Sequence, residues 1–243
     1  MRPLVIVKTG DTLPELAARR GDYDGWIRAG LALSGVRVDT VCVHRDEALP
    51  PPETVAGAVI TGSPAMVSER EPWSERTAAW LAEAVAAGTR ILGICYGHQL
   101  LAHALGGRVG PNPRGRQIGT IALDLDAPGD ALLGELPGQL VVQVTHVEVV
   151  LEFPPGAVPL GRNPMDPNAV FRVGDRAWGM QFHPEFDADV IRSYIRGRRP
   201  LIEGEGGDPD ALLAECRDSP HGAAILARFG ALVGNAEAAA GAA

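Results

Sequence analysis

The first half of the chain alternates short apolar runs with longer segments in which apolar residues recur at helical spacing. This alternation restricts the fold more than any other feature of the sequence. The expected strands are Leu4–Val7, Val36–Val43, Ala58–Thr61 and Arg90–Cys95, and the expected helical segments are Leu13–Leu33, Trp73–Ala87 and Gly97–Leu105. Continuous apolar strands that alternate with helices are typical of a mostly parallel sheet with helices on both faces. We therefore expect an α/β fold.

The second half has a different pattern, in which short β-like segments are separated by Gly and Pro. These segments are Gln117–Leu125, Leu140–Thr145, Val147–Leu151, Ala169–Val173 and Ala177–Phe182. Closely spaced short strands with turn residues between them favour antiparallel additions to the sheet. A helix is expected to follow at Asp187–Arg196.

The residues after position 197 are expected to form a helical extension that packs on the same domain, so that residues 1–197 make up the domain proper and 198–243 the extension. The Gly-rich, charged segment Arg198–Asp208 is typical of a loop. Ala211–Val233 has helical spacing, and the Ala/Gly-rich end Asn235–Ala243 is expected to be frayed.

Composition favours a cytoplasmic protein. A chain of 243 residues with 46% hydrophobic residues can bury one substantial core. The net charge of -8 argues against a nucleic-acid partner. No apolar run approaches the roughly 20 residues of a membrane helix. The apolar run after Met1 is too short for a signal peptide, so we interpret it as the first strand.

The three cysteines form no C-x-x-C pair, so we expect neither a disulfide framework nor a metal site. Cys42 lies in an apolar run and is interpreted as a small buried hydrophobe, and Cys216 is expected to have no chemical role. Cys95 differs from both because of its neighbours.

Cys95 lies in the pattern Gly93-Ile94-Cys95-Tyr96-Gly97, directly after an expected strand and directly before an expected helix. This is the arrangement of a nucleophile elbow, in which the glycines permit a sharp turn and close packing. The sulfur would lie at a helix N-terminus, whose dipole favours thiolate over thiol. The backbone N–H of Tyr96 could help to hold an oxyanion. A buried structural cysteine is the alternative, which the paired glycines make less favourable.

A thiolate nucleophile needs a base and an orienting group, and the segment Gln181-Phe182-His183-Pro184-Glu185-Phe186 offers both. His183 and Glu185 are two residues apart in an expected extended segment, so both can point to one side. Glu185 could accept a hydrogen bond from one ring nitrogen of His183. A surface His-Pro turn is the alternative.

The run Val59-Ile60-Thr61-Gly62-Ser63-Pro64 places a glycine turn after the third expected strand. A backbone N–H from such a turn could complete an oxyanion hole. The alternative is an ordinary βα loop.

Together these three segments resemble the class I glutamine amidotransferases, the Cys-His-Glu type, and in particular a stand-alone domain similar to that of GMP synthase. The resemblance runs from about Val59 to Phe186. It implies a flavodoxin-like sheet, acylation of Cys95, and His183 as a base oriented by Glu185. It also implies oxyanion contacts from the backbones of Gly62 and Tyr96.

The same resemblance implies a set of substrate-binding residues. Gln99 matches a position that holds the α-amino and carboxylate end of glutamine. Thr145, His146 and Val147 match a segment whose backbone faces the glutamine, although Thr145 and Glu148 replace the commoner Ser and Asp. His98 and His103, on the helix after the elbow, are interpreted as structural.

The expected reaction is hydrolysis of the glutamine side-chain amide to glutamate and ammonia through a Cys95 thioester, with no cofactor. The sequence leaves open a γ-glutamyl peptidase or hydrolase, and a catalytically silent binding subunit. It contains neither an ATP-pyrophosphatase motif nor a P-loop. We therefore expect it either to supply ammonia to a separate synthetase subunit or to act alone on a γ-glutamyl small molecule, and we favour action without an obligate synthetase. A homo-oligomer is compatible with the sequence.

Overall fold

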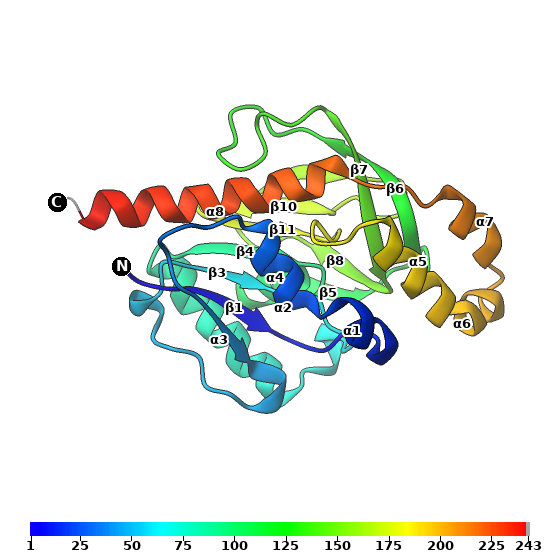
Figure 1. The fold of residues 1–243 in the computed structure, drawn as a ribbon, viewed down its shortest axis with the longest axis horizontal. Coiled ribbons are helices and arrows are strands. Elements are labelled where there is room, and N and C mark those ends of the chain that lie inside the picture. The colour runs from blue at the N-terminus through cyan, green and yellow to red at the C-terminus, as the bar shows by residue number, and fades with distance from the viewer. Residues whose placement is uncertain (242–243) are drawn as a thin grey trace.

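A nine-stranded mixed sheet runs through the centre of the computed structural model, which describes residues 1–241 (Figure 1). The strand order is β2-β1-β3-β4-β11-β10-β9-β6-β7. The five parallel strands are β2 (Val38–Cys42), β1 (Leu4–Lys8), β3 (Gly57–Ile60), β4 (Arg90–Ile94) and β11 (Ala177–Met180). The antiparallel part consists of β10 (Val170–Val173), β9 (Ala157–Arg162), β6 (Gln117–Leu125) and β7 (Gln139–His146). A separate antiparallel pair joins β5 (Arg108–Pro111) to β8 (Glu148–Glu152).

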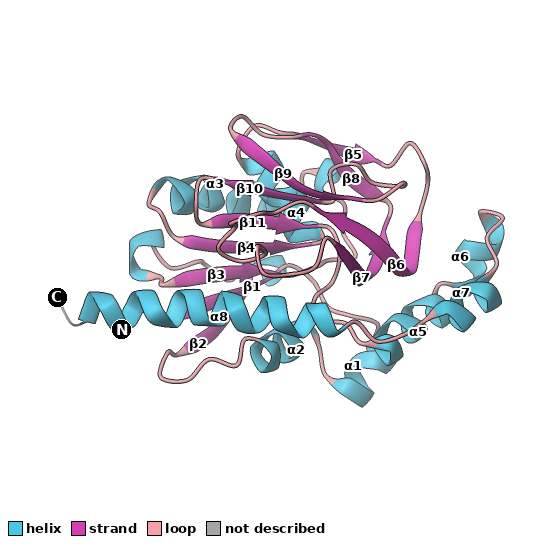
Figure 2. Cartoon of the chain, turned by 90° about the horizontal axis from the view of Figure 1, so that it is seen from above, coloured by secondary structure: helices cyan, strands magenta, loops and turns pink. Residues whose placement is uncertain are grey.

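Helices cover both faces of the sheet, as Figure 2 shows, with α8 on one face and α3 and α4 on the other. The first face carries α1 (Pro14–Arg20), α2 (Tyr23–Gly30), α5 (Ala188–Gly197) and α8 (Pro220–Gly241), and the second carries α3 (Pro72–Ala86) and α4 (Tyr96–Ala104). Two short helices, α6 (Arg199–Gly204) and α7 (Pro209–Glu215), lie near β6 and α5.

Strand β1 shows why the sheet must be covered on both faces. Its alternate side chains enter different cores: Leu4 and Ile6 belong to the core beneath α2 and α8, and Val5 and Val7 to the core beneath α3 and α4. All four are at most 1% exposed. A strand with two apolar faces is stable only between two helical layers. The expected α/β fold with helices on both faces is therefore confirmed.

The second half of the sheet differs in detail from the expectation. The segment expected as Ala177–Phe182 forms β11, which pairs antiparallel with β10 on one side and in parallel with β4 on the other, so that it joins the two parts of the sheet. Strands β5 and β9 were not expected at all, because the Gly and Pro residues that flank them indicated loops. Because β11 is parallel to β4, the residues after Met180 lie at the same end of these strands as Cys95.

The C-terminal segment corrects three expectations. Part of the expected loop Arg198–Asp208 is helix α6, whose Ile202 is buried in the core. The expected single helix Ala211–Val233 is two helices, α7 and α8, separated before Pro220, which begins α8. The expected fraying of Asn235–Ala243 is wrong as far as Gly241, because α8 continues there; Ala242 and Ala243 lie outside the described residues.

Contacts along its whole length hold α8 in place. Gly222 lies against Pro184, Gly230 against Leu31 and Gly57 of β3 against Val233, and in each case an added Cβ would come within 2.8 Å of the neighbour. Near the end of α8, Glu237 forms an ion pair of 2.7 Å with Arg2. Within residues 1–241, no helix combines the length and the apolar character that crossing a membrane requires.

Candidate active site

Cys95 occupies a strained turn between β4 and α4. Its φ and ψ are 51° and -100°, a conformation that few residues other than glycine adopt. Two glycines make the turn sterically feasible. A Cβ on Gly93 would lie 2.4 Å from the carbonyl oxygen of Gly97, and a Cβ on Gly97 would lie 2.4 Å from that of Ile60. The structure therefore has the elbow that the G-x-C-x-G pattern predicts.

The sulfur of Cys95 is buried, at 6% exposure for the residue, and it has two polar neighbours. The side-chain amide of Gln181 donates to Sγ at 3.5 Å, and the carbonyl oxygen of Thr145 lies 3.9 Å from Sγ. Gln181 is not among the site residues predicted from the sequence. Its position directly after β11, two residues before His183, is the signal that could have identified it.

His183 and Glu185 form a buried pair at the end of β11. Nδ1 of His183 lies 2.8 Å from Oε1 of Glu185, and their side chains are 2% and 0% exposed. The backbone N–H of His183 donates to the carbonyl of Gln143 on β7, at 2.8 Å, which fixes the start of this segment. The imidazole also stacks on the ring of Phe186, with centroids 4.0 Å apart.

The electrostatics of this pair favour an imidazolium. Burial by itself lowers the pKa of His183, but the Glu185 carboxylate and the nearby Cys95 sulfur outweigh burial and raise it well above its ordinary value. Nε2 of His183 is buried without a hydrogen-bond partner in the protein. The expected hydrogen bond to Glu185 is thus present. The Cys95 sulfur is close enough to the imidazole to help raise its pKa.

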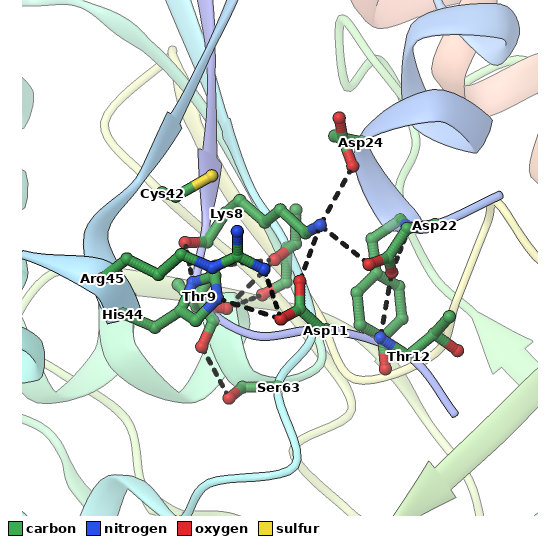
Figure 3. Close-up of polar contacts among 12 residues, drawn as sticks. Lys8, Thr9, Asp11, Thr12, Asp22, Asp24, Cys42, His44, Arg45 and Ser63 are labelled. Atoms are coloured by element: carbon green, nitrogen blue, oxygen red, sulfur yellow. Dashed lines mark hydrogen bonds and ion pairs between the residues drawn. The ribbon is translucent and has the colours of Figure 1, made fainter. Parts of the chain in front are cut away.

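Gly62 lies against the ring of His183, the predicted base. A Cβ added at Gly62 would be 2.8 Å from Cε1 of His183, so only glycine leaves room for the ring. Thr9, directly after β1, holds this turn: its hydroxyl donates to the carbonyl of Gly62 at 2.9 Å. The Ser63 hydroxyl donates in turn to the carbonyl of Thr9 at 2.8 Å (Figure 3). These contacts fix the backbone that was predicted to supply an oxyanion N–H.

A buried lysine anchors the same end of β1. Nζ of Lys8 lies 2.8 Å from Asp11, 2.7 Å from Asp22 and 3.4 Å from Asp24 (Figure 3). Burial lowers the pKa of Lys8, but its hydrogen bonds to Asp11 and Asp22 raise it above the ordinary value. The ion pairs of Lys8 with these three aspartates therefore connect the loop after β1 to the start of α2.

Tyr96, the second predicted oxyanion residue, is fixed by its side chain. Its hydroxyl lies 2.6 Å from the hydroxyl of Ser74, and its ring stacks on Trp73 with centroids 5.6 Å apart. Tyr96 is the first residue of α4, where backbone N–H groups have no intrahelical partner. Its N–H is thus placed at the elbow, beside the nucleophile.

The predicted substrate residues meet around one small cavity of about 30 Å³. It is lined by Cys95, Tyr96, Gln99, Thr145, His146, Val147, Glu148, Arg198 and the turn residues 63–66. The Gln99 side-chain amide donates to the carbonyl of Glu148 at 2.7 Å and to the side-chain oxygen of Gln181 at 3.1 Å. The ring nitrogens of His146 lie 3.1 Å from the carbonyl of Glu148 and 3.1 Å from the side-chain oxygen of Gln117.

His98 and His103, which were predicted to be structural, lie outside this cavity. His98 is fully buried against Phe171, with ring centroids 5.0 Å apart, and burial lowers its pKa to about 3. His103 pairs with Glu75 at 2.9 Å on the outer side of α4. Neither lines the cavity.

Three buried polar atoms around Cys95 have no partner in the protein. They are Oγ1 of Thr145, Nε2 of His183 and Oε2 of Glu185. Buried polar groups are almost always paired in folded proteins. A group of unpaired atoms next to a strained, buried cysteine indicates a site built to bind a polar molecule.

Comparison with known proteins identifies the family of this chain. The family model "Glutamine amidotransferase class-I" matches residues 22–195. The chain therefore belongs to the class I glutamine amidotransferase family. Within the family, it is similar to GMP synthase [glutamine-hydrolyzing] of Aeropyrum pernix, with 39% identity over 139 residues, or 57% of this chain and 25% of that protein. The chain thus spans about a quarter of the length of that relative.

Two further similarities extend over more of the chain. The glutamine amidotransferase-like protein chry6 of Gibberella zeae is 32% identical over 186 residues, which cover 74% of this chain and 73% of chry6. A crystal structure of a glutamine amidotransferase from Thermotoga maritima superposes with a TM-score of 0.68 at 21% identity, covering 98% of this chain and 97% of that one. The similarity to the Thermotoga maritima structure, at 21% identity, shows that the two chains share a fold.

Proposed function

We propose that this protein hydrolyses the side-chain amide of glutamine to glutamate and ammonia through a thioester on Cys95. The observation that carries the proposal is the buried His183–Glu185 pair beside the strained elbow of Cys95. The pair keeps His183 charged, and a charged imidazole next to a thiol favours the imidazolium–thiolate form that attacks carbonyl carbons.

The proposed reaction has two stages. The Cys95 thiolate attacks the δ-carbon of glutamine, and the backbone N–H groups of Gly62 and Tyr96 stabilise the oxyanion that forms. His183 transfers its Nε2 proton to the departing nitrogen, so that ammonia leaves and a glutamyl thioester remains. Water, deprotonated by His183, then attacks the thioester carbonyl and releases glutamate with restoration of the thiolate.

A γ-glutamyl peptidase or hydrolase is the second candidate, and a groove beside the cavity favours it. The groove has a volume of about 850 Å³, runs between β6 and the α6–α7 segment, and shares Val147 with the Cys95 cavity. Ammonia needs no such space, whereas an amino acid or peptide leaving group does. Both candidates present the same acyl half to Cys95, so the chemistry above applies to each.

A separate synthetase subunit would be the ammonia acceptor under the first candidate. Relatives over this region carry the name GMP synthase, which supports such a partner. The second candidate needs no partner. Turnover of the purified chain alone, compared with turnover after addition of co-purifying ATP-dependent proteins, separates these two arrangements.

The experiment that tests the proposal measures glutamate release by the purified chain from L-glutamine and from a γ-glutamyl dipeptide. In parallel, a glutamine analogue with an electrophilic carbon should modify Cys95, detectable by mass spectrometry of the Cys95 peptide. Cys42 and Cys216 serve as internal controls, because neither lies in the cavity. If the folded protein releases no glutamate and forms no adduct at Cys95, the silent-subunit alternative holds instead.

A further inference from the structure

The loop that follows β1 packs directly against the Gly62 turn, although no role was predicted for its residues. An added Cβ on Gly10 would lie 2.6 Å from Cδ of Pro64 and 2.8 Å from Oγ of Ser63, so only glycine permits this approach. The neighbouring Thr9 is 1% exposed, and both its hydroxyl and its carbonyl contact the turn (Figure 3). The loop after β1 thus supports the backbone that is proposed to stabilise the oxyanion.

The hydroxyl of Thr9 reaches two consecutive carbonyl groups of the turn. It lies 3.0 Å from the carbonyl oxygen of Thr61 and 2.9 Å from that of Gly62. The N–H of Thr9 donates to the Thr61 hydroxyl at 3.0 Å, and this hydroxyl donates to the carbonyl of Gly62 at 2.9 Å. A peptide group is planar and trans, so its N–H points away from its C=O. Holding the carbonyl of Thr61 therefore fixes the direction of the Gly62 N–H.

The N–H groups of Gly62 and Tyr96 have no acceptor among residues 1–241, although both residues are buried. The next N–H along the chain, that of Gly97, donates instead to the carbonyl of Thr61 at 3.2 Å. Buried backbone N–H groups are nearly always paired in folded proteins. Two free donors at the Cys95 site therefore suit an oxygen that the substrate brings, such as the oxyanion formed when a thiolate attacks a carbonyl.

We propose that Thr9 is a positioning residue for the reaction, which fixes the direction in which Gly62 presents its N–H to the oxyanion. This inference rests on the proposed function of the Cys95 site. A donor that is already aimed at the developing charge does not have to reorient during the reaction, and this preorganisation is what lowers the barrier. Thr9 acts through Gly62 and not on the substrate itself.

Thr9→Val is the informative substitution, because valine has nearly the shape of threonine and lacks the hydroxyl. The carbonyl of Thr61 keeps the Gly97 N–H as a donor, and the carbonyl of Gly62 keeps the Thr61 hydroxyl. The bond from the Ser63 hydroxyl to the backbone carbonyl of residue 9 is also retained. We therefore expect the variant to fold. It loses only the group that reaches both carbonyls, so that the Gly62 N–H can turn away from the oxyanion.

Three reagents separate the oxyanion contact from the reactivity of the thiolate. Iodoacetamide alkylates Cys95 by displacement of iodide and forms no oxyanion. The ester p-nitrophenyl acetate acylates Cys95 through an oxyanion but carries no glutamyl group. L-Glutamine requires both the oxyanion contact and recognition of the glutamyl group. The measurements are mass spectrometry of the Cys95 peptide for the first two reagents and steady-state glutamate release for the third.

Thr9→Val should react with iodoacetamide at the wild-type rate. Its acylation by p-nitrophenyl acetate and its kcat for L-glutamine should both fall roughly 10- to 100-fold, with KM nearly unchanged, because the lost contact acts on the transition state. Thr9→Ser keeps the hydroxyl and should recover most of the lost rate.

Thr89→Val is the matched control. Thr89 is 7% exposed, and its hydroxyl donates to the carbonyl of Pro52 at 3.4 Å, next to the start of β4 and away from Cys95. This variant should change none of the three rates. An equal loss with all three reagents in Thr9→Val would show that Thr9 only supports the fold, and acylation at the wild-type rate would show that it does not position the donor. Either result would overturn the inference.

Failure of the inference differs from failure of the proposed function. Suppose that the wild-type protein releases no glutamate but is acylated by p-nitrophenyl acetate at a rate that Thr9→Val lowers. Hydrolysis of glutamine is then refuted, and the inference stands. If the wild-type protein releases glutamate and Thr9→Val does so with the same kcat, the inference is refuted and hydrolysis stands.

Discussion

The imidazole of His183 stacks face to face on the ring of Phe186, with centroids 4.0 Å apart and planes 15° from parallel. Glu185 and Cys95 raise the pKa of His183 above its ordinary value, which favours the cationic form of the ring that Phe186 contacts. An aromatic face stabilises a cation by roughly 0.5 to 2 kcal/mol.

Phe186→Leu should therefore lower the pKa of His183 by about one unit, because leucine fills the space without offering a π face. The measurement is an NMR pH titration of the His183 Cε1 proton. Phe153→Leu, which alters an aromatic contact with Phe171 in the other core, is the matched control and should leave the titration unchanged. An unchanged pKa in Phe186→Leu would show that the stacking is packing alone.

Cys95→Ser should keep the fold and lower turnover by roughly 10³-fold or more, because a hydroxyl at neutral pH is a far poorer nucleophile than a thiolate. Steady-state glutamate release from L-glutamine is the measurement. Cys42→Ser and Cys216→Ser should retain most of the activity. Substantial residual turnover by the Cys95→Ser protein would refute the assignment of the nucleophile.

Gly62→Ala should separate activity from stability. The added Cβ would lie 2.8 Å from Cε1 of His183, so we expect the imidazole to move and turnover to fall, while thermal unfolding changes little. Gly25→Ala, in helix α2 with open space around the Cβ position, should keep full turnover and gain up to about 1 kcal/mol of stability. Wild-type turnover by Gly62→Ala would contradict the tight placement of His183.

Gln181→Leu should slow the reaction of Cys95 with iodoacetamide at neutral pH. The leucine removes the amide that donates to Sγ at 3.5 Å, and a hydrogen bond to a charged acceptor contributes roughly 1.5 to 3 kcal/mol. We therefore expect a rate lower by roughly 10-fold, measured by mass spectrometry of the Cys95 peptide. Gln139→Leu, at an exposed position on β7, should react at the wild-type rate. Equal rates in both variants would show that Gln181 does not stabilise the thiolate.

Acid should destabilise the folded protein through His98. Burial lowers the pKa of His98 to about 3 in the folded state, against about 6.5 in the unfolded chain. Between these values the unfolded chain binds the extra proton, so stability is present above pH 6.5 and falls as the pH falls. One such histidine lowers the free energy of unfolding by about 2 kcal/mol from pH 7.5 to pH 5.

His98→Gln removes this titration, so urea unfolding of the variant should lose about 2 kcal/mol less than wild type over the same pH interval. His146, whose pKa burial lowers to about 4, and Asp166, whose pKa burial raises to about 6, remain in both proteins and cancel in the comparison. Equal losses in the two proteins would contradict a neutral His98 in the folded state.

The sequence was sufficient for the features that short-range sterics determine. The elbow at Cys95 follows from Gly93 and Gly97, because no other residue permits the close approach of strand and helix. The burial of β1 in a core on each of its two faces was predictable in the same way, because its residues form a continuous apolar run. The contact of His183 with Glu185 was predictable because two residues separate them.

Features that depend on long-range packing could not be predicted in this way. Helix α6 is only six residues long and is held by the burial of Ile202 against distant strands, which local composition does not reveal. The position of Arg198 at the Cys95 cavity depends on the angle at which α6 leaves α5. Gln181 reaches the sulfur only because β11 pairs in parallel with β4.

The ion pair between Arg2 and Glu237 has a practical consequence for the orientation of the molecule on a surface. Arg2 precedes β1 and Cys95 follows β4. Because β1, β3 and β4 are parallel, the two residues lie at opposite ends of these strands. Figure 1 shows the N-terminus and the last turns of α8 on the same side of the molecule. Immobilisation through a tag attached at Met1 would therefore present the edge with Cys95 to the solution, so that substrates and partners approach it without obstruction by the support.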